Sequence, residues 1–205
     1  SEIDYKNALT AIFADMRNNL GDIPIYIQPI GRRTDFTNTG GIQSVRNIQK
    51  EVVAENPWCY HATEIYDLTL YDAVHLSNSA YETAAERNSL TLLNSSGAQG
   101  PTITAVSRSG TTITVTILHD AGSDFTPALG IEGFVFFDNT TPISITSANR
   151  VNSTTINLTL AVAPSSGIET LYYGYDDMAG LNTANVVTDN ASLPMPLQTV
   201  KINIS

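Results

Sequence analysis

Apolar residues near the start of the chain recur at the three- and four-residue spacing of a helix face, and this pattern stops at Gly21. Residues 23–28 then form a nearly continuous apolar run, which is typical of a buried parallel strand. A second helical stripe over residues 42–52 stops at Asn56-Pro57, because the residue before a proline disfavours the helical conformation. Residues 58–63 predict another strand. The first stripe consists of Ala8, Leu9, Ile12, Phe13, Met16 and Leu20.

A third helix is predicted from the S-x-x-E pattern at Ser79–Glu82 to about Leu93, since this pattern is typical of a capping box. The order is then helix, strand, helix, strand, loop and helix, which implies right-handed crossovers onto a parallel sheet. Two strands are too few for a stable parallel sheet that is buried on both faces. We therefore expect residues 1–96 to be the C-terminal part of a larger α/β domain whose start lies before Ser1.

In the second half of the chain, apolar and polar residues alternate with period two. Several short strands of this kind, separated by turns, predict an antiparallel β-sandwich over residues 97–205. The segment 94–101, rich in Gly and Ser and ending in Pro, is the expected junction. The fold class is therefore α/β plus all-β. The predicted strands are 102–106, 112–117, 133–137, 155–160 and 170–175.

Composition excludes several classes of function. The 205 residues carry 10 basic and 20 acidic side chains, a net charge of −10, which argues against a nucleic-acid partner. No apolar run approaches the ~20 residues of a membrane span, so membrane insertion is not expected. The single cysteine, Cys59, excludes an internal disulfide and is expected to be a small buried hydrophobe. We expect neither a metal nor a cofactor, since Asp120 and Asp124 offer too few ligands for a calcium loop.

The most specific candidate for chemistry is the stretch Y-D-A-V-H-L over residues 71–76. Asp72 and His75, three apart on a loop, can form a hydrogen-bonded pair. The carboxylate would then fix the imidazole tautomer and stabilise the imidazolium that forms when His75 takes a proton from a hydroxyl nucleophile. The competing interpretation is an ordinary surface turn, because D-x-x-H also occurs by chance.

Two further groups of residues are candidates for sugar binding. Gln28, Arg32 and Arg33 follow the strand at 23–28, at the carboxyl end where open α/β sheets bind ligands. They are predicted to hold an anionic or hydroxylated sugar, and ordinary loop polarity is the alternative. Six aromatic residues of the second half can stack on sugar rings, although alternation predicts core packing for at least half of them. These are Phe134, Phe136, Phe137, Tyr172, Tyr173 and Tyr175.

The D-x-V-H-L motif, followed by a helix start of small residues and Tyr81, resembles the last sequence block of SGNH (GDSL-type) hydrolases. Among these hydrolases, it is most similar to the carbohydrate esterases of the sialate O-acetylesterase-like branch. The resemblance implies a flavodoxin-like parallel sheet, with His75 as general base and Asp72 as its orienting carboxylate in a Ser-His-Asp triad. The aromatic strands and Leu193-Pro194-Met195-Pro196 resemble the accessory β-domain of such esterases, as in bacteriophage tailspikes.

The sequence departs from that family at the nucleophile. Neither a G-D-S or G-Q-S block nor the oxyanion-hole blocks occur, and no serine of residues 1–95 is predicted on a strand-to-helix turn. We therefore expect a C-terminal fragment that is inactive alone. The resemblance implies a parent that deacetylates an O-acetylated surface polysaccharide, as a homotrimeric phage tailspike or tail fibre on the virion tail, or as a secreted or periplasmic bacterial enzyme. The alternative is a non-catalytic glycan-binding or structural, trimerising module of a tail fibre or secreted protein.

Overall fold

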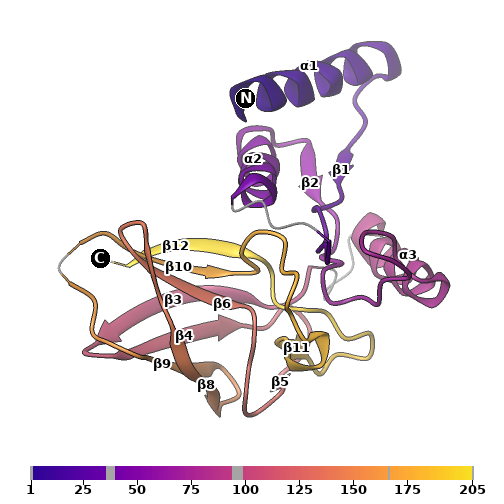
Figure 1. The fold of residues 1–205 in the computed structure, drawn as a ribbon. Coiled ribbons are helices and arrows are strands. Elements are labelled where there is room, and N and C mark those ends of the chain that lie inside the picture. Colours follow the sequence, from indigo (N-terminus) through magenta and orange to yellow (C-terminus); the bar gives the residue numbers. More distant parts are fainter. Residues whose placement is uncertain (1, 36–39, 94–98, 166, 205) are drawn as a thin grey trace.

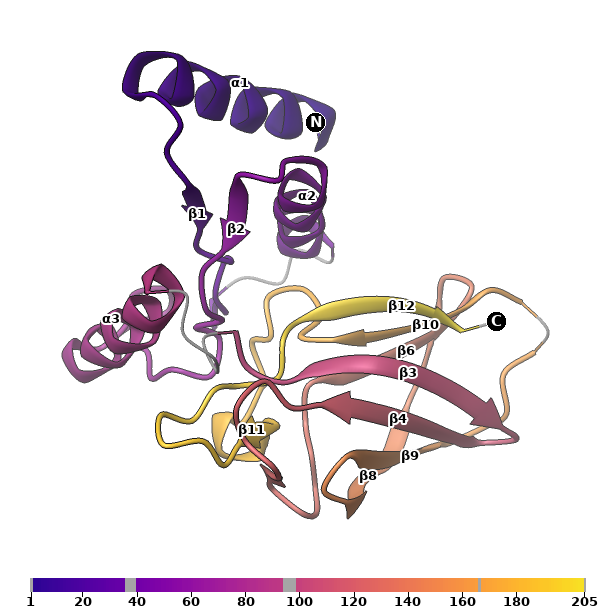
Figure 2. The same cartoon turned by 180° about the vertical axis from the view of Figure 1, so that it is seen from behind.

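A computed structural model describes residues 2–35, 40–93, 99–165 and 167–204. The first half has the predicted order of elements, and β1 and β2 pair in parallel as expected, with Tyr26 opposite Tyr60. Both views of the ribbon show α1 and α2 next to this two-stranded sheet (Figures 1 and 2). The elements are α1 (Glu2–Leu20), β1 (Ile25–Ile27), α2 (Gly41–Glu55), β2 (Cys59–His61) and α3 (Asn78–Leu92).

The ends of the first two helices follow the predicted signals. Gly21 adopts a φ of 85°, and its N–H donates to the carbonyl of Arg17 at 2.9 Å, which closes the last turn of α1. Asn56 is extended, as a residue before proline prefers, and α2 ends at Glu55.

The start of α3 differs from the prediction. Ser77, and not Ser79, is the N-cap, because its Oγ accepts a hydrogen bond from the N–H of Ala80 at 3.3 Å. Ser77 has the extended backbone that an N-cap requires, whereas Ser79 already lies inside the helix. The S-x-x-E pattern therefore identified the helix but placed its cap two residues too late.

The predicted apolar stripe of α1 is only partly used. Phe13 is buried against residues of β1, α2 and β2, whereas Ile12, Met16 and Leu20 are exposed. Burial against the described residues thus accounts for one edge of the stripe and leaves the other edge in contact with solvent.

The second half forms two four-stranded antiparallel sheets, and the alternation predicted antiparallel strands here. Five of the eight strands were predicted, whereas the strands at 141–143, 145–152 and 200–204 were not. The strand orders of the two sheets are β3-β4-β9-β8 and β12-β10-β6-β7, and Figure 2 shows them as two layers. The first sheet contains β3 (Thr102–Ser109), β4 (Thr112–Leu118), β8 (Ile145–Asn152) and β9 (Thr155–Leu160). The second contains β6 (Phe134–Asp138), β7 (Thr141–Ile143), β10 (Glu169–Tyr173) and β12 (Val200–Ile204). β5 (Phe125–Thr126) and β11 (Thr188–Asp189) pair separately, next to a short 3₁₀ helix (Thr183–Asn185).

One hydrophobic core lies between the two sheets, and it includes a residue from the first half. Tyr66 is fully buried in this core, and its hydroxyl donates to the carbonyl of Leu197 at 2.6 Å. Glu64 accepts hydrogen bonds from the N–H and the hydroxyl of Thr199. The two halves are therefore joined by a buried interface as well as by the chain. The division into domains at 96/97 stays a prediction, and its junction at 94–98 lies outside the described residues.

Candidate functional site

The loop that carries the D-x-x-H motif is closed at its base by backbone bonds. Leu70 and Leu76 form an antiparallel bridge, and the N–H of Tyr71 donates to the carbonyl of His75 at 2.8 Å. The N–H of Ser77 donates to the carbonyl of Thr69, and α3 begins one residue later. The five residues 71–75 therefore project from the junction between the second strand and α3 with a fixed geometry.

Within this loop, Asp72 holds His75 through both of its carboxylate oxygens. Oδ1 accepts the backbone N–H groups of Val74 and His75, each at 2.8 Å, and Oδ2 accepts the Nδ1–H of His75 at 2.8 Å. The side chain of His75 is 66% exposed, and its Nε2 has no hydrogen bond to any residue that the structure describes. The predicted pair is thus formed, with one ring nitrogen anchored and the other available.

These hydrogen bonds stabilise the ionised form of Asp72. The N–H of Val74, then the N–H of His75 and the His75 ring, lower the pKa of Asp72 from 3.8 to about 2. Because the folded-state pKa lies below the ordinary value, the pair's contribution to stability is present above about pH 4 and is lost as the pH falls toward 2.

A pH titration followed by carbon NMR is expected to show a midpoint near pH 2 for the Asp72 carboxyl. In His75→Ala the two backbone hydrogen bonds remain, so the pKa of Asp72 should stay below its ordinary value. A midpoint near 3.8 in this variant would show that the backbone N–H groups do not lower the pKa.

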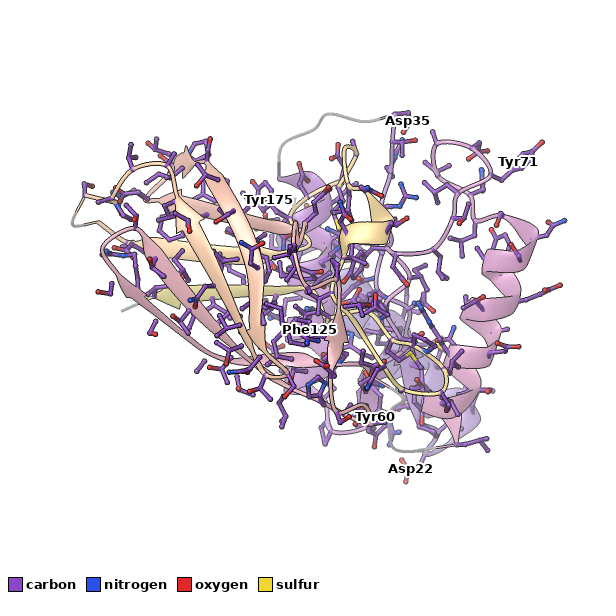
Figure 3. All side chains as sticks on the ribbon, turned by 90° about the horizontal axis from the view of Figure 1, so that it is seen from below. Asp22, Asp35, Tyr60, Tyr71, Phe125 and Tyr175 are labelled. Carbon is purple, nitrogen blue, oxygen red and sulfur yellow. The ribbon has the colours of Figure 1, made fainter. Side chains whose placement is uncertain are left out.

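The two predicted arginines lie beside this loop. The N–H of Thr34 donates to the carbonyl of Ala73 at 2.9 Å, and Figure 3 shows the loop of Tyr71 next to the segment that ends at Asp35. Arg32 and Arg33 line a mostly apolar hollow of about 390 Å³ together with Val74. Its other lining residues are Ile30, Gly31, Ile65, Leu70 and Leu76.

The two arginines are held differently. Arg32 donates to the carbonyl of Leu68, and its Nε is buried without a hydrogen bond in the part of the chain that is described. Arg33 forms an exposed ion pair with Asp35 at 2.9 Å. The role of Arg32 and Arg33 in binding a sugar stays a prediction.

Gln28 lies elsewhere. Its amide nitrogen donates to the carbonyl of Thr63, and its amide oxygen accepts from Asn88 on α3 at 2.8 Å. The structure therefore brings Arg32 and Arg33 to the Asp72 loop, whereas Gln28 links the sheet to α3. Its sugar-binding role also stays a prediction.

Two further side chains that can carry chemistry, Cys59 and His61, lie on β2. Cys59 is buried, as expected, and burial raises the pKa of its thiol. His61 is half-buried on β2, and burial, together with the charge of Lys50, lowers its pKa. Among the described residues, no three His, Cys, Asp or Glu side chains are grouped to hold a metal ion. The described helices include none that is long and apolar enough to cross a membrane.

Comparison with known proteins adds a likeness of fold. No family model matches the sequence, and no curated protein matches it. A carbohydrate acetylesterase from Xanthomonas citri superposes with a TM-score of 0.70 at 14% identity, over 97% of this chain and 46% of that one. The S-layer protein SbsC gives a TM-score of 0.40 at 13% identity, over 98% of this chain and 22% of that one.

The chain therefore spans less than half the length of the acetylesterase that it resembles. At this identity the likeness concerns the fold: a small parallel sheet with helices, followed by antiparallel sheets, arranged as in part of a carbohydrate acetylesterase.

Proposed function

We propose that this chain is the part of a carbohydrate O-acetylesterase that supplies the base and its orienting carboxylate. The observation that carries the proposal is the Asp72–His75 pair, with Nδ1 of His75 anchored at 2.8 Å and Nε2 exposed. An imidazole held in this tautomer presents Nε2 as a proton acceptor, as a Ser-His-Asp triad requires. The fold likeness to a carbohydrate acetylesterase supports the same activity.

In the proposed reaction, a serine from polypeptide outside residues 1–205 attacks the acetyl carbonyl carbon while Nε2 of His75 takes its proton. The tetrahedral intermediate collapses, the ester C–O bond breaks, and the sugar oxygen leaves with the proton from His75. Water then hydrolyses the acetyl-serine by the same route, so that acetate is released and the serine regains its proton. Asp72 stays ionised throughout and stabilises the imidazolium.

Two features of the first half support the presence of further polypeptide around it. β1 has only β2 as a neighbour in the described sheet, so its other edge can accept another parallel strand. Ile12, Met16 and Leu20 leave an apolar strip of α1 uncovered, which a larger α/β domain would bury. In this proposal the additional polypeptide supplies the serine and the oxyanion donors.

The location of the nucleophile tests this proposal. A fluorophosphonate probe, applied to the longest protein that contains this chain, is expected to label a serine outside residues 1–205. The isolated chain is expected to be unlabelled and to release no acetate from acetylated xylan above background. Labelling of Ser77, two residues from His75, with acetate release by the isolated chain would contradict the proposal.

We further propose that the parent protein is a homotrimeric phage tailspike or tail fibre that deacetylates an O-acetylated surface polysaccharide of the host. The support is compositional: the β half is rich in Thr, Ser and Asn and contains no cysteine, which suits an extracellular particle. Antibodies against this chain should then label the tails of intact virions.

A further inference from the structure

We propose that a second site, a cleft between α2 and the outer face of β10, binds an uncharged sugar unit. The cleft has a volume of about 600 Å³ and is lined by residues of α1, α2, β10 and β12. Figure 1 shows α2 above β10 and β12, and Figure 3 places Tyr175 where the two halves meet. The inference shares only the ligand class, carbohydrate, with the proposed esterase and does not depend on Asp72 or His75.

The floor of the cleft is aromatic. Tyr172 and Tyr175 line it, and their ring centroids lie 4.8 Å apart at 63°. Phe137 packs against both rings, at 5.7 Å and 5.2 Å, without lining the cleft itself. Each of the two tyrosines is therefore held in place by the other and by Phe137, and each keeps part of its surface exposed.

Strand periodicity explains why these rings face the cleft. On β10, Leu171 and Tyr173 are buried in the core between the sheets, so Tyr172 points to the opposite face. Tyr172 lies across from Lys201 on β12, whose ammonium group is 5.9 Å from the Tyr172 ring centre. Tyr172 is therefore not part of the core of the β-sandwich, and its ring is available to contact a ligand in the cleft.

The wall opposite the rings is polar. Gln43, Asn47 and Glu51 recur every four residues on α2 and so line up along one face of the helix. Gln43 donates to Oδ1 of Asn47 at 2.9 Å, which leaves the Nδ2 group of Asn47 as a donor for a ligand. Gln43 itself is buried, and its amide oxygen accepts the N–H of Asp176 at 3.2 Å, so its role is to orient Asn47. The amide of Asn47 and the carboxylate of Glu51, across the cleft from the aromatic rings, match a pyranose ring with its hydroxyl rim and its apolar C–H face.

The charges in the cleft favour a neutral ligand. Among the lining residues, Lys6 and Lys201 are matched by Glu2 and Glu51. Lys6 is paired with Glu51 at 3.2 Å and with Glu55, next to the cleft, at 2.6 Å. The balance leaves no net positive charge to hold the carboxylate of an acidic sugar. A neutral sugar unit can displace water from these charged side chains without adding an unpaired charge to the cleft.

The cleft is linked to the candidate catalytic loop by a short path. Two residues beyond Tyr175, the carbonyl of Asp177 accepts the N–H of Arg33 at 2.9 Å, and the adjacent Thr34 is bonded to Ala73. A polysaccharide held in the cleft would thus lie next to a segment that is hydrogen-bonded to the loop of His75.

A titration of the ¹⁵N-labelled 205-residue chain followed by NMR tests the inference, with xylohexaose, cellohexaose and trigalacturonate as probes. Either neutral probe is expected to shift the side-chain amide of Asn47 and the backbone amides of Tyr172 and Lys201, with a Kd of about 1 mM. Tyr172→Ala should weaken binding about tenfold, and Tyr172→Phe should stay within about twofold, because the ring remains. Asn47→Ala, on the opposite wall, provides a second test that leaves the β-sheet untouched.

Tyr60→Ala is the matched control, since Tyr60 is an exposed ring stacked on a second tyrosine, Tyr26, and lies outside the cleft. Its affinity should equal that of the unaltered chain, as should that of His75→Ala. Absence of shifts in the cleft with both neutral probes up to about 10 mM, equal affinity in Tyr172→Ala, or tighter binding of trigalacturonate would each overturn the inference. The effect of His75→Ala on acetate release, measured in the longest protein that contains this chain, is independent of these results, so the two proposals fail separately.

Discussion

His75→Ala is expected to reduce kcat for acetyl release by about 10⁴- to 10⁶-fold in the longest protein that contains this chain. The substitution removes Nε2, the proton acceptor that the proposed reaction requires, and leaves Asp72 with its two backbone hydrogen bonds. KM for an acetylated oligosaccharide should change little, since the exposed imidazole contributes to the chemical step more than to ground-state binding. The ratio of the two kcat values is obtained from the rates of acetate release at saturating substrate, measured for the variant and for the unaltered protein.

Asp72→Asn tests the second member of the pair. The amide can donate to Nδ1 of His75 and so favours the tautomer with its proton on Nε2, which is the wrong one for a base. A loss of about 10⁴-fold in kcat is expected.

His119→Ala is the control for both substitutions, because His119 lies in the β half and contacts the carbonyl of Ser153. It should keep kcat within about threefold. Full activity in His75→Ala would contradict the assignment of the base, and equal losses in all three variants would indicate unfolding.

Arg46→Met is expected to lower the free energy of unfolding by about 3–5 kcal/mol. Arg46 is 1% exposed, and its guanidinium donates to four backbone carbonyls. Two belong to the first half, Ile30 at 3.0 Å and Gly31 at 2.7 Å. The other two belong to the β half, Gly174 at 3.0 Å and Asp176. Methionine fills similar space but leaves these carbonyls without a hydrogen-bond donor. The free-energy penalty of the buried, unpaired carbonyls exceeds the gain from burying the apolar methionine side chain.

The measurement for Arg46→Met is urea unfolding followed by circular dichroism. Burial lowers the pKa of Arg46 to about 10, so the side chain remains charged at neutral pH. Arg33→Met is the matched control, because the ion pair of Arg33 with Asp35 is exposed, and it should cost no more than about 1 kcal/mol. Equal midpoints for Arg46→Met and the unaltered chain would show that the interface between the halves does not depend on this residue.

Local sequence was sufficient for most elements and for one part of the site. Period-two alternation and helical spacing depend on residues that are close in the chain, and they predicted the three helices, β1, β2 and five strands of the second half. They did not predict β7, β8 and β12, nor the short strands β5 and β11. The Asp72–His75 pair was predictable for the same reason, since every bond that forms it lies within four residues. The cap of α3 was missed because Ser77 and Ser79 are both good caps, and only the backbone after the loop selects Ser77.

The cleft and the buried interface could not be read from such patterns. Tyr172 and Tyr175 were candidates for sugar stacking, but Asn47 and Glu51 resembled any polar face of a helix. Nothing near Arg46 in the sequence indicates that it is buried, because two of its acceptors lie 128 and 130 residues away.

The sequence by itself thus determined the types of the elements, the change from parallel to antiparallel pairing and the local pair of Asp72 and His75. Only the tertiary structure decided which edge of the α1 stripe is buried, which arginine joins the halves and which tyrosines face a cleft. The physical reason is the range of the interactions. Backbone periodicity and short loops are fixed by neighbouring residues, whereas burial and the partners of a guanidinium depend on which distant segments the fold brings together.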